Sequence, residues 1–148
     1  MDIGGGSTEV IVFQGNKKVL SRSCEVGTVR LLNEETQNPA PAKVLIKNLE
    51  SWCQQLLADG GISTLPVQVF GTGGNVRRMG KLRKNVLKQK NKNIITQNEI
   101  AQLYQLLLPL SVADRIQKFG FKKDRAEVIV HALRIFFTIV TQCKVEQI

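Results

Sequence analysis

Hydrophobic and polar residues alternate near the start of the chain in the way that favours β-strands. Two such runs, residues 9–13 and 17–24, are separated by Gly15 and Asn16. Because glycine and asparagine adopt the backbone angles of tight turns, the two runs predict a β-hairpin. Gly27 ends the second run.

The segment after the hairpin contains apolar residues at the spacing of a helix. Apolar residues recur from 44 to 57, after a loop expected at 38–41, and predict an amphipathic helix that ends at Gly60 and Gly61.

A strand, a glycine turn and a helix are then predicted in succession. The apolar run 67–70 predicts a short strand, residues 71–75 form a glycine-rich turn, and a segment compatible with a helix follows. Residues 85–93 are nearly all lysine, asparagine and glutamine, which predicts a solvated connector. This order of elements indicates an α/β fold.

Two further helical segments follow the connector. Thr96 and Glu99 have the spacing of a capping box, which predicts a helix over 97–108. A weaker helix or turn is expected over 111–118.

The last segment is apolar nearly all round and predicts an interior helix from about Asp124, as its N-cap, to about Cys143. Within it, His131 and Arg134 interrupt the apolar stretch 128–140, which favours a buried helix over a membrane span. Since His131 is the sole histidine, the sequence offers no histidine triad or multi-histidine metal site, and a core position is expected for it.

Composition indicates one globular domain over residues 1–148, because 43% of the residues are hydrophobic and 22% are charged. Cys24, Cys53 and Cys143 lie far apart and are odd in number, so neither a zinc site nor a disulfide framework is expected. The cysteines and the lack of a targeting segment predict a cytoplasmic protein with no membrane partner.

The net charge of +9 is concentrated in one segment, which we call the basic stripe. Its eight basic residues, with no acid among them, are Arg77, Arg78, Lys81, Arg83, Lys84, Lys88, Lys90 and Lys92. Three interpretations are open: a solvated surface, a site for a linear polyanion such as polyphosphate, or a nucleic-acid site. The absence of aromatic residues within the stripe disfavours nucleic acid.

Residues 2–9, which we call the octet, combine two acids, three glycines and two hydroxyls. Glycines let the backbone approach an anion and direct several N–H groups at it, which points to phosphate. Asp2 could hold a hydrated Mg²⁺, and Ser7 and Thr8 could donate to phosphate oxygens. A P-loop is excluded because no lysine follows the glycines. A glycine-rich turn without a ligand is the competing interpretation.

The octet resembles the second phosphate loop of the Ppx/GppA phosphatases, the exopolyphosphatases and guanosine pentaphosphate phosphohydrolases of the actin, Hsp70 and sugar-kinase superfamily. Residues 25–31 are similar to the glycine-x-valine-arginine-leucine segment of that family. Residues 71–75 resemble its second glycine turn, and residues 125–132 the start of its long helix.

This resemblance implies a ribonuclease H-like (actin-like ATPase) domain with a mixed sheet, an N-terminal phosphate-loop hairpin and flanking helices. It also implies Mg²⁺-dependent attack of water on a terminal phosphoryl group. Asp2 would be a catalytic and metal-binding carboxylate, and Glu9 an orienting acid. The residues expected to bind phosphate are Gly4, Gly5, Gly6, Ser7, Thr8, Gly71, Thr72 and Gly73. Those expected to bind a polyanion are Arg77, Arg78, Lys81, Arg83 and Lys84.

The expected reaction is hydrolysis of terminal phosphoanhydride bonds of inorganic polyphosphate, with guanosine pentaphosphate as the alternative substrate. Two further classes of function stay open, a non-catalytic polyanion-binding module and an ATP-binding sugar-kinase-like domain. The family's first phosphate loop and its general base would lie upstream of the octet, and its last strand beyond residue 148. We therefore expect one domain of a two-domain cleft, with the first domain as a covalent or separate partner and a homodimer as a further option.

Two arginines are expected to have structural roles. Arg30 could pair with a phosphate, but its expected place at a strand end favours a structural contact with a carboxylate. Arg125 is expected to form ion pairs with Asp124 and Glu127 in the first turn of the last helix.

Overall fold

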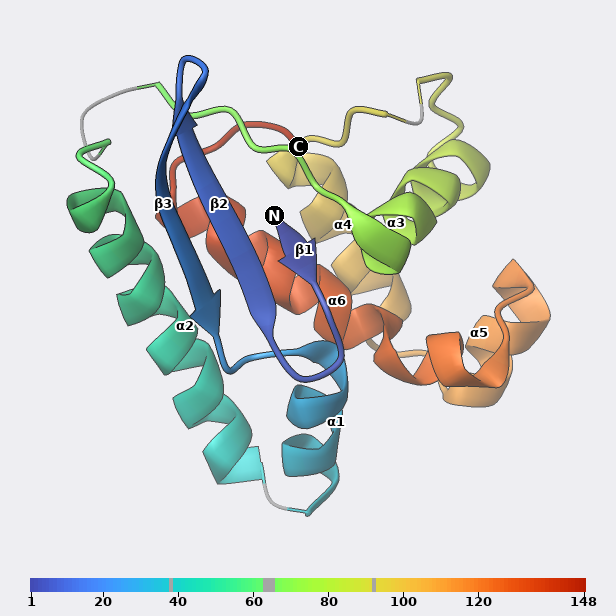
Figure 1. Cartoon of the computed structure of the whole chain (residues 1–148). Coiled ribbons are helices and arrows are strands. Elements are labelled where there is room, and N and C mark those ends of the chain that lie inside the picture. The colour runs from blue at the N-terminus through green and yellow to red at the C-terminus, as the bar shows by residue number, and fades with distance from the viewer. Residues whose placement is uncertain (38, 63–65, 92) are drawn as a thin grey trace.

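The computed structural model describes residues 1–37, 39–62, 66–91 and 93–148. Its three strands form one antiparallel sheet in the order β1 (Asp2–Ile3), β2 (Thr8–Gln14) and β3 (Lys17–Cys24). Helices pack behind this sheet, and the face turned to the viewer in Figure 1 is uncovered by the described elements. The predicted α/β class is confirmed.

The β2–β3 hairpin is formed as predicted. Gln14 pairs with Lys17, and Gly15 between the strands has a φ of 59°, in the left-handed region that favours glycine. The alternation of the strands separates two faces. Thr8 and Val12 are buried against the helices, whereas Ile11 and Phe13 are 50% and 59% exposed on the other face.

Two helices follow the sheet, α1 (Thr28–Gln37) and α2 (Pro39–Asp59). The expectation that Arg30 lies at a strand end is wrong, because it lies in the first turn of α1. The expectation of a loop at 38–41 is also wrong for residues 39–41, because α2 begins at Pro39. Residue 38 lies outside the described residues. Proline suits the first helical position, where its missing N–H would have no partner.

The predicted strand at 67–70 is absent from the described chain. A single parallel bridge joins Thr72 to Asp2, so the parallel part of the expected mixed sheet is confined to this bridge among the described residues. The neighbouring strand β1 has two residues, and backbone hydrogen bonds join this segment to Met1 at Phe70 and Thr72. The predicted helix after the glycine turn is confirmed as α3 (Gly73–Val86).

The remaining helices are α4 (Gln97–Leu107), α5 (Val112–Phe119) and α6 (Lys123–Gln142). The capping box of Thr96 and Glu99 is confirmed at the start of α4. A second capping box, Ser111 with Asp114, begins α5. Asp124 lies in the first turn of α6 rather than at its N-cap, which is Lys122.

Helix α6 runs through the middle of the core. Phe136 and Leu133 are fully buried on it, and His131 is 7% exposed. Glu35 of α1 accepts a hydrogen bond from Arg134 and lies 3.4 Å from Nδ1 of His131. Burial lowers the pKa of His131, so this histidine is neutral at pH 7 and Arg134 supplies the charge that pairs with Glu35.

The three cysteines are free and buried. None of the helices over the described ranges is long and apolar enough to cross a membrane.

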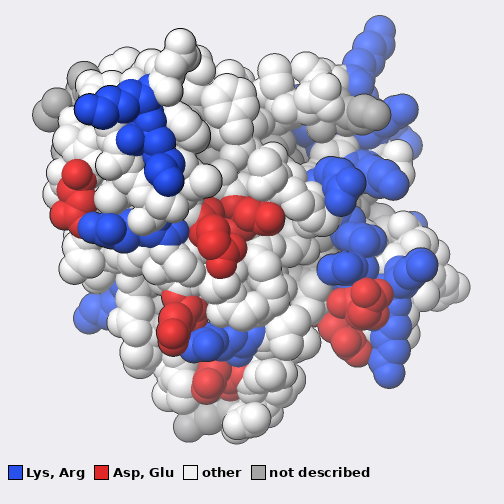
Figure 2. All heavy atoms as spheres, viewed as in Figure 1, with Lys and Arg blue, Asp and Glu red and all other residues white. Residues whose placement is uncertain are grey.

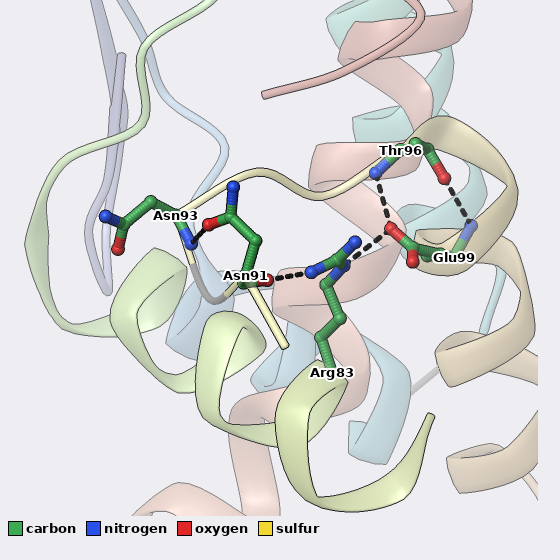
Figure 3. Close-up of polar contacts among 5 residues, drawn as sticks. All are labelled: Arg83, Asn91, Asn93, Thr96 and Glu99. Carbon is green, nitrogen blue, oxygen red and sulfur yellow. Dashed lines mark hydrogen bonds and ion pairs between the residues drawn. The ribbon is translucent and has the colours of Figure 1, made fainter. Parts of the chain in front are cut away.

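A buried ion pair joins α3 to α4 (Figure 3). Nε of Arg83 lies 2.7 Å from a carboxylate oxygen of Glu99, and the two side chains are 10% and 12% exposed. Arg83 also donates to the backbone carbonyl of Asn91. Burial alone raises the pKa of Glu99, but hydrogen bonds from Arg83 and Thr96 outweigh it and hold the pKa below its ordinary value.

Replacing Arg83 by methionine would leave the Glu99 carboxylate buried without its partner. We expect Arg83→Met to lower the free energy of unfolding at pH 7 by about 3–5 kcal/mol, measured by urea denaturation. The matched control is Lys84→Met, the exposed neighbour on the same helix, which should change it by about 0.5 kcal/mol or less.

The difference in the free energy of unfolding between wild type and Arg83→Met should become smaller at acidic pH. Because the folded-state pKa of Glu99 is lowered, the pair stabilises the protein above the ordinary pKa of 4.5 and this stabilisation is lost as pH falls through the folded value. Equal effects of the two substitutions at pH 7 would contradict an internal role for Arg83.

Candidate phosphate site

The glycine loop of the octet is held by the first turn of α1. The carbonyl of Gly4 accepts a hydrogen bond from the N–H of Thr28 at 3.0 Å. The carbonyl of Gly5 accepts from the N–H groups of Val29 and Arg30 at 2.9 and 3.1 Å. The first turn of a helix has N–H groups without helical partners, and here the loop carbonyls supply the acceptors.

This contact fixes the direction of two N–H groups in the loop. All described peptide bonds are trans, so the N–H of each peptide unit points opposite to its carbonyl. The N–H groups of Gly5 and Gly6 therefore point away from α1. Neither they nor the N–H of Ser7 has an acceptor among the described residues. Consecutive N–H groups that point outward from a glycine turn form an anion-binding concavity.

Close approach of the two backbones requires a glycine at position 27. A methyl group there would lie 2.4 Å from the carbonyl oxygen of Gly5 and 2.5 Å from the carbonyl carbon of Gly6. A side chain at this position would push the loop away from α1. The sequence shows Gly27 as the end of a strand, whereas the structure gives it this second role.

Glu9 and the two hydroxyls of the octet differ in exposure and in their hydrogen-bond partners. Glu9 is exposed and accepts hydrogen bonds from Ser7 and, at 3.5 Å, from Ser23. Thr8 is fully buried, and its hydroxyl donates to the carbonyl of Val26 at 2.7 Å. The expectation that the Thr8 hydroxyl faces phosphate is therefore corrected: it ties β2 to the segment before α1.

The structure brings the second glycine turn to the octet. Thr72 bridges to Asp2, and its N–H donates to the carbonyl of Met1 at 2.8 Å. Gly73 has a φ of 84°, and a methyl group there would lie 2.3 Å from a carboxylate oxygen of Asp2. The carboxylate of Asp2 thus lies against the start of α3, where no side chain caps the helix.

Sequence reasoning did not single out Asn75 as a functional residue. Its side-chain N–H group donates to the carbonyl of Ile3 at 2.7 Å, and the residue is 7% exposed. Its side-chain oxygen is buried without a partner among the described residues. An unpaired buried amide oxygen costs about 1–3 kcal/mol. Its position in a glycine turn is the one signal that could have drawn attention to it.

A shallow groove of about 590 Å³ lies between the glycine loop and α1. Its lining residues are Gly5, Gly6, Val29, Arg30, Asn33, Glu34 and Gln37. Arg30, at the edge of the loop, pairs with Glu25 at 3.0 Å, which agrees with the carboxylate contact expected for it. At the start of α6, Arg125 pairs with Asp124 at 3.1 Å.

The basic stripe is divided by the fold. Arg77, Lys81 and Lys84 are exposed on α3, and Figure 2 shows basic side chains gathered at the right of the molecule, over α3 and α5. Arg78 is half-buried, and burial lowers its pKa. The expectation that Arg83 binds a polyanion is wrong, because its guanidinium is buried against Glu99. Lys92 lies outside the described residues.

The oxygen donors at the glycine loop bear on whether Mg²⁺ could be held there. This ion prefers oxygen ligands, retains several waters and commonly uses one or two carboxylates together with substrate phosphates. Asp2 at the glycine loop supplies such a carboxylate. No group of three acidic, histidine or cysteine side chains that could hold a metal occurs in the described parts of the chain. The residues therefore fit an ion shared with a phosphate ligand rather than one enclosed by protein.

A family model of the Ppx/GppA phosphatases matches residues 1–148. The chain belongs to the Ppx/GppA phosphatase family. Exopolyphosphatase 1 of Mycobacterium tuberculosis is 26% identical over 137 residues, which cover 88% of this chain and 40% of the relative. Exopolyphosphatase 1 of Mycobacterium leprae is 25% identical over the same extent. The chain thus spans about two-fifths of the length of these Ppx/GppA relatives.

Solved structures of Ppx/GppA proteins share the fold. A crystal structure of the Aquifex aeolicus Ppx/GppA phosphatase has a TM-score of 0.76 and 24% identity, covering 99% of this chain and 50% of that one. An exopolyphosphatase from Cytophaga hutchinsonii has a TM-score of 0.69 and 21% identity, covering 96% and 48%. The actin-like fold predicted from the Ppx/GppA resemblance is confirmed.

The contact between Gly27 and the loop is open to a direct test. We expect Gly27→Ala to lower the free energy of unfolding by about 1–3 kcal/mol, because the methyl group must displace the loop. The amide NMR resonances of Gly5 and Gly6 should shift with it. Gly74→Ala is the control, since a methyl group there meets no atom within 4 Å. Unchanged Gly5 and Gly6 resonances in Gly27→Ala would show that the loop does not depend on α1.

Proposed function

We propose that this chain supplies one phosphate loop of a cleft that hydrolyses the terminal phosphoanhydride bond of inorganic polyphosphate. The observation that carries the proposal is the orientation of the Gly5 and Gly6 N–H groups, which α1 directs to the open side of the loop. Membership of the Ppx/GppA family supports the class of reaction.

In this reaction, water attacks the terminal phosphorus while the bond to the bridging oxygen breaks, releasing orthophosphate and a chain shorter by one unit. The N–H groups of Gly5 and Gly6 would donate to terminal phosphate oxygens, whose charge is then stabilised by preorganised donors rather than by mobile water. Ser7 would donate to the same group after leaving Glu9. Asp2 would hold Mg²⁺, which when bound neutralises phosphate charge.

The general base is expected on the first domain of the cleft, and Glu9, which accepts the hydrogen bond of Ser7 in this structure, would release the hydroxyl to phosphate. Thr72 and Gly73 lie beside Asp2 and would border the site. The exposed cations of α3 would hold the remainder of the polyanion by charge attraction. Cytoplasmic location and homodimer formation are part of the same proposal.

The groove beside the loop favours a second candidate, guanosine pentaphosphate. Arg30, Asn33 and Glu34 present donors and acceptors of the kind that pair with the edge of a guanine base. Polyphosphate stays the first candidate because the basic side chains of α3 suit a long polyanion, which carries no nucleobase.

The deciding experiment measures orthophosphate release from polyphosphate with Mg²⁺, for this chain alone and for this chain joined to an upstream Ppx/GppA first domain. We expect release from the joined protein only. Asp2→Asn in the joined protein should lower kcat by about 10²-fold or more, because it weakens the metal-binding carboxylate. Asp59→Asn, on the exposed end of α2, is the control.

Release from neither protein would overturn the proposed hydrolysis. Release by the short chain alone would show that the base lies in this chain, with Glu9 as the first residue to replace.

The role of α3 is tested by salt dependence. A variant with Arg77, Lys81 and Lys84 changed to glutamine should bind polyphosphate with a log–log salt slope about 2 units shallower, because three ion contacts are lost. The control carries the same charge change at Lys17, Lys43 and Lys47, which are exposed on other elements. An equal slope in both variants would remove α3 from polyanion binding.

A further inference from the structure

The side chain of Asn75 joins the two glycine turns. It lies in the first turn of α3, and its N–H group donates to the carbonyl of Ile3, the residue directly before Gly4. Backbone pairing between this region and β1 ends one residue earlier, at the bridge between Asp2 and Thr72 and the bonds that Met1 makes to Phe70 and Thr72. The side chain of Asn75 therefore extends this contact between the two segments as far as the edge of the phosphate loop.

The peptide unit that Asn75 holds also closes the loop. In the unit between Ile3 and Gly4, the carbonyl accepts from Asn75 and the N–H of Gly4 donates to the carbonyl of Ser7 at 2.9 Å. Helix α1 holds the carbonyls of the next two units. Three consecutive peptide units are thus oriented, the first from α3 and the following two from α1.

The oxygen of the Asn75 side-chain amide does not stabilise the fold. The donor of this amide must face the carbonyl of Ile3, which leaves the oxygen buried without a partner in the described structure. An unpaired buried acceptor destabilises a fold. An apolar side chain of similar size would remove the unpaired oxygen but would leave the Ile3 carbonyl without the donor that Asn75 supplies. The asparagine is therefore accounted for by this hydrogen bond and not by packing alone.

We propose that Asn75 is a positioning residue for phosphate: it orients the peptide unit that closes the glycine loop and so presets the N–H groups that receive the terminal phosphate. The inference rests on the proposed function in naming phosphate as the ligand. It adds a buried side chain of α3 to the groups that orient the glycine loop, which otherwise belong to the octet and α1.

Two variants separate positioning from packing. Asn75→Leu removes the unpaired oxygen but also the donor to the Ile3 carbonyl, so the two effects on stability oppose each other and a packing role predicts unchanged phosphate binding. Positioning predicts at least a tenfold loss of tripolyphosphate affinity, measured by calorimetry with Mg²⁺ at a salt concentration that screens α3. Asn75→Asp keeps the shape, loses the donor and should lose affinity similarly. Asn98→Asp, exposed on α4, is the control for the added charge.

Hydrogen exchange in the ligand-free protein gives a readout that does not require phosphate binding. We expect the Gly4 amide to exchange at least tenfold faster in both Asn75 variants, while the Leu133 amide in the core of α6 keeps its wild-type rate. Unchanged exchange at Gly4, or an equal increase at Leu133, would overturn the inference. If wild type fails to bind tripolyphosphate while Gly4 exchange responds as expected, the proposed function fails and the positioning role of Asn75 stands.

Discussion

The geometry of the candidate site depends on the capture of two loop carbonyls by the first turn of α1. The first N–H groups of a helix need acceptors, which the loop carbonyls provide. The same hydrogen bonds fix the orientation of the glycine loop. Gly27 permits the contact because it has no side chain between the two backbones. Glu35 in turn pairs with Arg134 of α6, so the helix that orients the loop is itself fixed to the core.

The elements that could be predicted from the sequence are those with local causes. The β2–β3 hairpin follows from alternation around Gly15, and the start of α4 follows from the capping box of Thr96 and Glu99. The segment at Thr28 could not be assigned this way, because its short apolar pattern suits a strand or a helix. The carbonyls of the glycine loop, which are distant in sequence, accept its first N–H groups and favour the helix.

The same distinction applies to the site. The glycines could be proposed as candidates because few other residue types allow a backbone to approach an anion, and Asp2 because a carboxylate beside them can hold a cation. Thr8 and Arg83 could not be assigned correctly, because their roles depend on tertiary partners, the carbonyl of Val26 and the carboxylate of Glu99. Composition counts a buried guanidinium and a solvated one alike, and only packing separates them.

The donors of the candidate site belong mainly to the backbone, and this divides the site into two independent parts. The direction of the Gly5 and Gly6 N–H groups is set by peptide geometry, by α1 and, as we propose, by Asn75, with no contribution from the side chains of Ser7 or Glu9. Reactive side chains around such a cradle can therefore change without rebuilding it. If the loop binds phosphate as proposed, selectivity among phosphate ligands is left to the surface around it.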